Sequence, residues 1–155
     1  GFHKAIEGGR ANPSVRILEK GRRKAGSVYA KRLGIDPEDD IFFIRRLNMA
    51  DDMPISVEHI YVPSEFVPNL LDIDLDLFSL YDVYGFYGST PVRAWQTLDI
   101  VPLEPRVARA LEVEDDKDAL LFVCTSYRAD GRAIEFVRSF NRSDACCFTV
   151  KNGMR

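Results

Sequence analysis

The stretch from Ile41 to Pro63 constrains the fold of this chain more than any other part of the sequence. It begins with an apolar run, continues through a polar turn at residues 50–53, and ends with a second run rich in β-branched residues that stops at Pro63. Two such runs separated by a short polar turn are typical of a β-hairpin. The sequence therefore predicts two adjacent antiparallel strands here.

Polar side chains are placed regularly along this predicted hairpin. Arg46 and Asn48 lie two positions apart on the first strand, and Ser56 and Glu58 lie two positions apart on the second. Successive side chains of a strand point to opposite faces, so the two members of each pair share a face. A cation, an amide and a carboxylate are expected to converge above one face of the sheet.

The same pattern recurs further along the chain, at an offset of 78 or 79 residues. The segment Ala50–Ile55 resembles Ala129–Ile134, and Leu33–Ile35 resembles Leu111–Val113. Each copy has the order strand, helix, hairpin. We therefore predict an α+β domain with an internal pseudo-twofold repeat, in which a six-stranded, mostly antiparallel sheet has helices on one side.

The remaining elements follow from hydrophobic periodicity and from helix-start and turn residues. A short amphipathic piece with helical spacing is predicted near the beginning of the chain, and an additional edge strand near its end. A basic run at residues 20–24 is predicted to be a solvated loop. The expected elements are Phe2–Asn12 (amphipathic), Val15–Leu18 (strand), Ala25–Leu33 (helix, capped by Gly34), Ser79–Tyr84 (helix), Thr90–Val101 (strand), Glu104–Leu111 (helix), Ala119–Phe140 (second hairpin) and Cys146–Val150 (edge strand).

Composition limits the class of protein. The 155 residues, 46% hydrophobic and 29% charged, are typical of one globular domain spanning residues 1–155. The net charge of −3 argues against direct nucleic-acid binding by this stretch. No apolar run approaches the roughly 20 residues of a membrane span. Three cysteines indicate reduced thiols in a cytoplasmic protein rather than a disulfide framework.

Motifs for catalysis and for bound cofactors are not visible in the sequence. The two histidines, His3 and His59, have no second ligand at metal spacing, so we expect no metal site. A Gly-rich phosphate loop, a nucleophile elbow and a Ser-His-Asp order are likewise missing. We therefore expect a protein that is not an enzyme and that needs no cofactor.

Four sequence blocks, in order and spacing, carry a resemblance to a known family. They are RRL…ADDMPISVEHIYVP, DLFSLYDVYG, RAWQTLDIVPLEPRVARAL and YRADGRAIEFVRSFNRSDACCF. Together they cover roughly Val15 to Val150 and resemble the UTRA domain, the effector-binding domain of GntR-type transcription regulators of the HutC branch. The resemblance implies a chorismate-lyase-like fold, a homodimer and a small-molecule effector bound in a cleft of the sheet. It also implies a cytoplasmic repressor that contacts operator DNA through a winged-helix domain N-terminal to Gly1.

The resemblance also implies a set of site residues. Family members that bind phosphorylated amino sugars carry an Arg-Leu-Arg triplet in the first hairpin, and Asn48 here replaces the second arginine. A later tyrosine of the family is replaced by Asn141. We therefore expect a ligand that is less highly charged or differently shaped. The effector-binding residues implied are Arg46, Asn48, Glu58, Ser79, Leu80, Tyr81, Glu135 and Asn141.

Elementary chemistry gives these residues distinct roles. The helix start at Ser79 offers unpaired backbone N–H groups to an anion, and Arg46 can add a charge-assisted fork. Glu58 and Glu135 accept hydrogen bonds and would select hydroxyl, amide or amine groups. Simpler readings exist for two of them, because Ser79 is also a favoured helix cap and Arg46 can form an ordinary surface ion pair.

The function expected from the sequence is a ligand-sensing, dimerising regulatory domain. Its ligand would be a small anionic metabolite such as a sugar phosphate, an amino-sugar phosphate or a small carboxylate. Ligand binding would shift dimers between operator-competent and incompetent states. Two alternatives remain open. The first is a lyase of the same fold acting on a small aromatic acid such as chorismate, and the second is a dimerisation module without a ligand.

Overall fold

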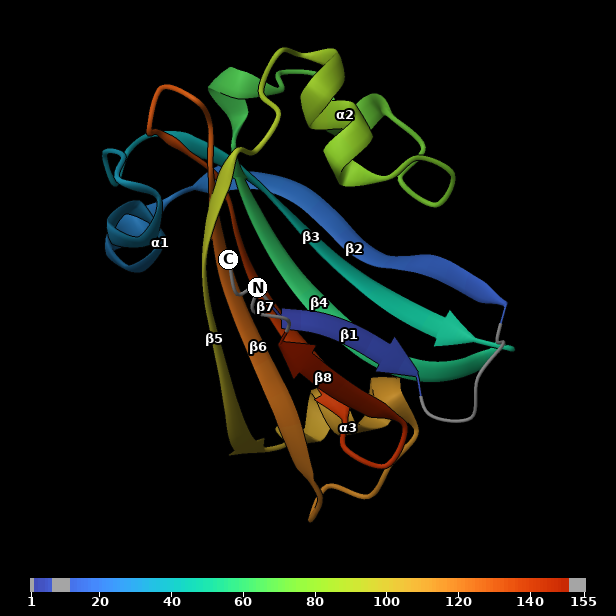
Figure 1. Cartoon of the computed structure of the whole chain (residues 1–155). Coiled ribbons are helices and arrows are strands. Elements are labelled where there is room, and N and C mark those ends of the chain that lie inside the picture. Colours follow the sequence, from blue (N-terminus) through green and yellow to red (C-terminus); the bar gives the residue numbers. More distant parts are fainter. Residues whose placement is uncertain (1, 7–11, 151–155) are drawn as a thin grey trace, which may run out of the picture.

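A six-stranded antiparallel sheet forms the centre of the computed structural model, which describes residues 2–6 and 12–150 (Figure 1). The strands lie in the order β2-β3-β4-β7-β6-β5, and each neighbouring pair is antiparallel. This confirms the predicted sheet. The strands are β2 (Pro13–Lys24), β3 (Asp40–Ala50), β4 (Met53–Pro63), β5 (Arg93–Pro102), β6 (Asp118–Tyr127) and β7 (Ala133–Arg142).

Within the described residues, three α-helices cover the sheet, on both faces. The helices α1 (Gly26–Leu33) and α3 (Pro105–Leu111) pack on one face, against the clusters that contain Phe136 and Phe140, respectively. The sequence predicted that the helices lie on one side of the sheet, and this is correct for α1 and α3. The third helix, α2 (Leu80–Phe86), lies on the opposite face, because its apolar side chains pack against alternate residues of β3 and β4. That cluster includes Phe42, Ile44, Ile60, Val62, Leu80, Val83 and Tyr84.

The two halves of the chain repeat the same structure, as the sequence predicts. The order β2-α1-β3-β4 matches β5-α3-β6-β7, and β4 pairs with β7 at the centre. The helices end alike, with Gly34 (φ 65°) and Glu112 (φ 57°) both in the left-handed conformation. In addition, irregularities in the register follow Asn48 in β3 and Ser126 in β6. Equivalent deviations at equivalent positions support a pseudo-twofold repeat over a merely similar strand order.

The turn of the first hairpin has the predicted position. Asp51 and Asp52 both have positive φ, 49° and 61°. Two left-handed residues at the centre of a tight turn match the right-handed twist of the flanking strands. The Asn12 backbone N–H donates to Asp51 Oδ1 at 3.0 Å, which ties this turn to the start of β2.

Both described ends of the chain differ from expectation. Phe2–Ile6 forms a strand, β1, so the predicted helical spacing is wrong there, while residues 7–11 lie outside the described residues. Cys146–Val150 is a strand as predicted, but this strand, β8, pairs with β1 in a separate two-stranded sheet. A pattern of apolar residues over only five positions fits the periodicity of a helix as well as that of a strand. Pairing with a distant segment decides which of the two forms.

The basic run at residues 20–24, which was predicted to be a loop, also has a different structure. It lies inside β2 rather than in a loop, because β2 continues to Lys24. Arg22 and Lys24 form ion pairs with Asp40 on β3 at 3.2 and 3.1 Å. As β2 is an edge strand, these long side chains remain largely in solvent while their backbone joins the sheet.

Among the described residues, no helix is both long and apolar enough to cross a membrane.

The two left-handed helix ends give a prediction for stability. A Cβ at Gly34 would meet no atom within 4 Å, so Gly34→Ala has only the conformational cost of positive φ. We expect it to lower the free energy of unfolding by about 1 kcal/mol, and Glu112→Gly to raise it by about the same amount. Urea unfolding followed by circular dichroism measures both. Equal stabilities for Gly34→Ala and the unmodified chain would contradict the assignment of a left-handed cap.

Candidate functional site

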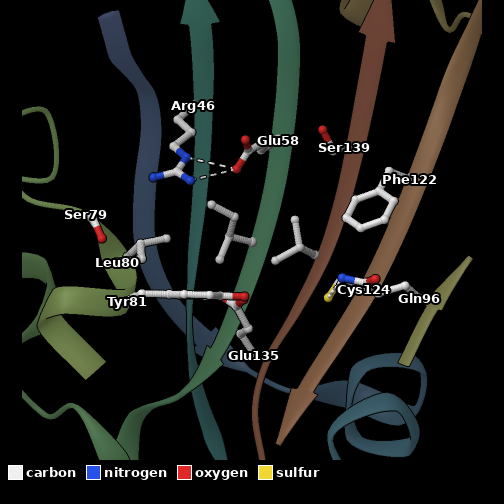
Figure 2. Close-up of a pocket in the computed structure, with 12 residues that line it drawn as sticks. Arg46, Glu58, Ser79, Leu80, Tyr81, Gln96, Phe122, Cys124, Glu135 and Ser139 are labelled. Carbon is white, nitrogen blue, oxygen red and sulfur yellow. Dashed lines mark hydrogen bonds and ion pairs between the residues drawn. The ribbon is translucent and has the colours of Figure 1, made fainter. Parts of the chain in front are cut away.

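A pocket of about 370 Å³ lies on the sheet face that α2 covers, and it is open to solvent on one side (Figure 2). Its floor is formed by alternate residues of β3, β4, β7, β6 and β5, and its wall by the start of α2. It is lined by Arg46, Glu58, Ile60, Ser79, Leu80, Tyr81, Gln96, Phe122, Cys124, Glu135, Val137 and Ser139. Six of the eight predicted site residues are in this set.

The strand register arranges the floor in parallel rows that run across the sheet. One row is polar at one end and aromatic at the other, and consists of Arg46, Glu58, Ser139 and Phe122, each opposite the next. The neighbouring row is mostly apolar, with Ile60, Val137, Cys124 and Gln96. Beyond it lies Glu135, opposite Ser126. The pocket therefore has two charged positions separated by an apolar strip.

Arg46 and Glu58 form an ion pair at one end of the floor. Arg46 Nε and Nη2 both lie 2.9 Å from Glu58 Oε2 (Figure 2). The side chains of Arg46 and Glu58 are 19% and 16% exposed, so the ion pair is largely buried but still accessible to solvent. Within the described residues, Arg46 Nη1 has no hydrogen-bond partner. This terminal nitrogen remains able to donate to a ligand while the other two nitrogens hold Glu58.

Asn48 and Asn141 lie one row further along the same face and do not line the pocket. Asn48 Nδ2 donates to Ser56 Oγ at 3.1 Å and also to Glu58 Oε1. Asn141 is fully buried, and its Nδ2 donates to the carbonyls of Leu120 and Ser139. Both amides thus support lining residues, and direct contact of either one with a ligand stays a prediction.

Glu135 lies at the other end of the floor and is almost completely buried. The Tyr84 hydroxyl donates to Glu135 Oε2 at 2.7 Å, and Ser126 Oγ donates to Oε1 at 3.3 Å. Burial disfavours the carboxylate form more strongly than the hydroxyl groups of Tyr84 and Tyr81 favour it, so the pKa of Glu135 is raised above its ordinary value. Burial similarly raises the pKa of the Tyr84 hydroxyl.

The start of α2 supplies the wall of the pocket. Ser79 caps the helix, because its Oγ accepts the Asp82 backbone N–H at 3.2 Å. This is the simpler of the two predicted readings, and the Ser79 hydroxyl proton remains available to a ligand. Tyr81 Oη lies 3.3 Å from Ser126 Oγ, and burial together with the Glu135 charge raises the pKa of Tyr81 to about 12. Tyr81 is therefore a neutral hydroxyl near neutral pH.

The residues that sequence reasoning missed lie mainly on β5, β6 and β7. Ser139 is four positions beyond Glu135 on β7, so strand alternation alone would have placed it on the same face. Finding Phe122, Cys124 and Gln96 requires the register of β6 and β5 as well. Gln96 Nε2 lies 3.8 Å from Cys124 Sγ, and burial raises the pKa of that thiol. The thiol is thus protonated and unreactive at neutral pH.

The ionisable groups that line the pocket include one guanidinium and two carboxyl groups, from Arg46, Glu58 and Glu135. Donors, acceptors and one aromatic face surround a small solvent-open volume, which suits the binding of a polar metabolite. No group of three or more His, Cys, Asp or Glu side chains in the described part of the chain could hold a metal ion.

Comparison with known proteins gives a consistent result. The UTRA domain model matches residues 9–146 of the chain. The chain is 28% identical over 137 residues to the transcriptional repressor NagR of Bacillus subtilis, covering 88% of this chain and 56% of NagR. It is 25% identical over 128 residues to the mannosyl-D-glycerate transport/metabolism system repressor MngR of Escherichia coli, covering 81% of this chain and 52% of MngR. The chain thus spans about half the length of these relatives.

Solved structures resemble the fold closely. The effector domain of PhnF from Mycobacterium smegmatis superposes with a TM-score of 0.82 at 25% identity, covering 86% of this chain and 82% of that domain. A GntR-family transcriptional regulator from Enterococcus faecalis superposes with a TM-score of 0.80 at 24% identity, covering 90% and 100%. The second likeness bears on the fold alone.

The buried carboxylate gives a prediction for pH dependence. Because the pKa of Glu135 is raised in the folded chain, the folded chain keeps its proton where the unfolded chain, with an ordinary value of 4.5, has lost it. The contribution of protonated Glu135 to the free energy of unfolding therefore decreases as pH rises above about 4.5. The free energy of unfolding falls by at most ~1.4 kcal/mol per pH unit from this group. Glu135→Gln should gain stability relative to the unmodified chain as pH rises.

Urea unfolding at several pH values between 4 and 8 measures this difference. Glu38→Gln is the matched control, because it removes an exposed carboxylate in the loop before β3. The control should follow the unmodified chain over the whole range. A stability difference for Glu135→Gln that does not change with pH would contradict the assigned pKa shift.

Proposed function

The chain belongs to the UTRA domain family, the effector domain of GntR-family transcription regulators, and on this premise we propose that its pocket binds a small anionic metabolite. The proposed ligand class comprises sugar phosphates, amino-sugar phosphates and small carboxylates. The observation that carries the proposal is a solvent-open pocket whose charged groups stand at two separate ends of an apolar floor. Such a pocket can hold and orient a polar molecule without reacting with it.

The anionic group of the ligand is assigned to the Arg46 end of the pocket. Arg46 Nη1 can donate to the anion while Nε and Nη2 keep their contacts to Glu58. The Ser79 hydroxyl can donate from the α2 wall while its oxygen accepts the Asp82 N–H. A single cation with one open nitrogen suits a ligand of low charge. This agrees with the presence of Asn48 where sugar-phosphate binders of the family carry a second arginine.

The remainder of the ligand is assigned to the two carboxylates and the aromatic end. Glu58 and Glu135 can accept from hydroxyl or amine groups, and Tyr81 and Ser139 can both donate and accept. Phe122 offers an apolar face of the kind that packs against the C–H surface of a sugar ring. The name of one relative, MngR, refers to a sugar joined to glycerate, which places sugar acids among the compounds to test.

The rest of the protein is assigned from the relatives. NagR and MngR are about twice as long as the matched region and are named as repressors. We therefore place a DNA-binding domain N-terminal to this domain, a homodimer as the working state, and the cytoplasm as its location. The ligand would act by binding one dimer arrangement more tightly than another, which shifts the population that can hold operator DNA.

A regulatory role is favoured over the lyase alternative. The relatives are named as transcriptional regulators, and the buried Cys124 thiol and the capped Ser79 hydroxyl are not activated nucleophiles. Incubation with chorismate followed by an assay for pyruvate tests the alternative directly. Release of pyruvate by the unmodified chain would contradict the proposal.

A thermal-shift screen against the three ligand classes tests the proposal itself. A ligand at about 100 times its Kd adds about 2.7 kcal/mol of stability, which raises the Tm of a domain of this size by several degrees. Arg46→Gln should remove most of that shift. The matched control is Arg45→Gln, because Arg45 is the next residue on β3, is similarly buried at 15% exposed, and contacts Glu19 and His59 on the opposite face. Equal loss in both variants would remove Arg46 from the site.

A second prediction concerns ligand charge. Asn48→Arg would place a further cation beside Glu58, in the row next to Arg46. We expect this variant to bind sugar phosphates at least about tenfold more tightly, a change of about 1.4 kcal/mol, and neutral sugars no more tightly. Isothermal titration of matched phosphorylated and unphosphorylated sugars measures the difference. If Asn48→Arg and the unmodified chain prefer phosphorylated over unphosphorylated sugars to the same extent, the anionic group of the ligand does not lie near residue 48.

A further inference from the structure

The face of the sheet that carries α1 and α3 has a row of basic side chains between these two helices. The strand register sets His59 of β4 opposite Arg45 of β3 on one side and opposite Arg138 of β7 on the other. The helix α1 packs against Phe136 and α3 against Phe140, the residues two positions before and after Arg138 (Figure 1). We call Arg45, His59 and Arg138 the basic row, and all three are partly exposed.

One carboxylate contacts the cations of this region in the described part of the chain. Arg45 Nη1 lies 3.4 Å from Glu19 Oε2, and Arg106 of α3 shares the same oxygen at 3.5 Å. The Arg138 guanidinium forms no ion pair or hydrogen bond with a described residue, and it lies over the Phe140 ring at 5.1 Å. Three arginines therefore share a single negative charge, and Arg138 has no part of it.

The imidazole of His59 is held neutral between the two arginines of the row. Arg45 Nε donates to His59 Nε2 at 3.2 Å, which leaves the ring proton on Nδ1. Burial, together with the charges of Arg45 and Arg138, lowers the pKa of His59 to about 4. The Nδ1–H group has no acceptor among the described residues. The row thus offers an unpaired guanidinium beside an unpaired ring N–H.

The two faces of the same strands differ in how they treat their cations. On the pocket face, Arg46 lies opposite Glu58 and forms an ion pair with it. One residue away, on the face of α1 and α3, the position opposite Arg45 is a neutral imidazole, and a second arginine follows. Cations gathered without matching carboxylates cost stability, and such departures from local rules are typical of binding sites, where a ligand supplies the missing charge.

We propose that the basic row is a second anion site, which binds a phosphate group on the face of the sheet opposite the pocket. Arg138 donates guanidinium N–H groups to the phosphate oxygens, and His59 donates Nδ1–H. The Tyr61 hydroxyl accepts from the Tyr29 hydroxyl at 2.8 Å and keeps its own proton, and the charge of Arg138 acts on it. It is the third donor. Arg45 holds the imidazole in place.

The His59 ring is a specific reporter for this site. Its neighbour Glu58 lines the pocket, and successive side chains of a strand point to opposite faces. The chain has two histidines, so the ring signals of His59 are identified in NMR spectra by their loss in His59→Gln. Addition of sodium phosphate at pH 7 and constant ionic strength should shift the His59 signals until they saturate, which gives the Kd for phosphate.

Arg138→Gln should raise this Kd at least about tenfold, because it removes the free cation of the row. The matched control is Arg32→Gln on α1. Arg32 also lies over a phenylalanine ring, that of Phe136 at 5.3 Å, and is outside the row. The control should keep the Kd within roughly twofold of the unmodified value. Circular dichroism and thermal melting of each variant confirm that it is folded.

A parallel titration with glucose 6-phosphate distinguishes the two sources of the phosphate group. Tighter binding of the sugar phosphate assigns the row to a phosphate ester, and equal affinities assign it to free phosphate. A compound bound at the row should lose its effect in Arg138→Gln and keep it in Arg46→Gln, the reverse of a compound bound in the pocket. The two proposals therefore fail separately.

Four results would each overturn the second site. The first is a His59 signal that responds to neither phosphate compound, and the second is a response that disappears in Arg46→Gln. The third is equal weakening by Arg138→Gln and Arg32→Gln. The fourth is a response to a DNA duplex without any response to the two small phosphates.

Discussion

The pairing of β4 with β7 is the interaction on which the rest of the structure depends. It joins the two hairpins into one sheet over six residue pairs, from Ser56 opposite Asn141 to Tyr61 opposite Phe136. It also sets the site, because Glu58 lies beside Ser139 and Ile60 beside Val137 only in this register. A slip of one residue would turn every side chain of one hairpin to the other face and would separate Glu58 from the pocket.

Local sequence signals predicted the parts of the structure that depend on local contacts. The first hairpin, the Gly34 cap and the repeat follow from turn residues and spacing, and all are present. Tertiary contacts decided the rest. Phe2–Ile6 became a strand because β8 pairs with it, and α2 lies on the pocket face because β3 and β4 offer apolar side chains there. Nothing in the residues near either segment encodes such a partner.

The same division applies to the site. Arg46, Glu58 and Glu135 could be found because charged residues within strands are conspicuous, and the structure places all three in one pocket. Phe122 and Cys124 could not be found, because apolar residues in a strand resemble ordinary core. Asn48 and Asn141 were assigned as ligand contacts, yet they lie one row away and hydrogen-bond to residues near or in the pocket. Sequence position identifies the face of a strand, while the boundary of a pocket depends on what covers that face.

The repeat has a consequence for how a ligand sits in the pocket. The pocket straddles the pseudo-twofold axis, so its floor contains positions from the first half together with their counterparts from the second. These counterparts differ in chemistry: Arg46 corresponds to Cys124, Glu58 to Val137, and Ile60 to Ser139. The strands of the floor could accept a molecule in either of two opposite orientations. The floor side chains distinguish the two, and so does the start of α2, which follows β4 and has no equivalent after β7 in the described residues. Divergence between two copies of one structural unit has thus given a symmetric scaffold a polar binding axis, along which an asymmetric molecule has one favoured direction.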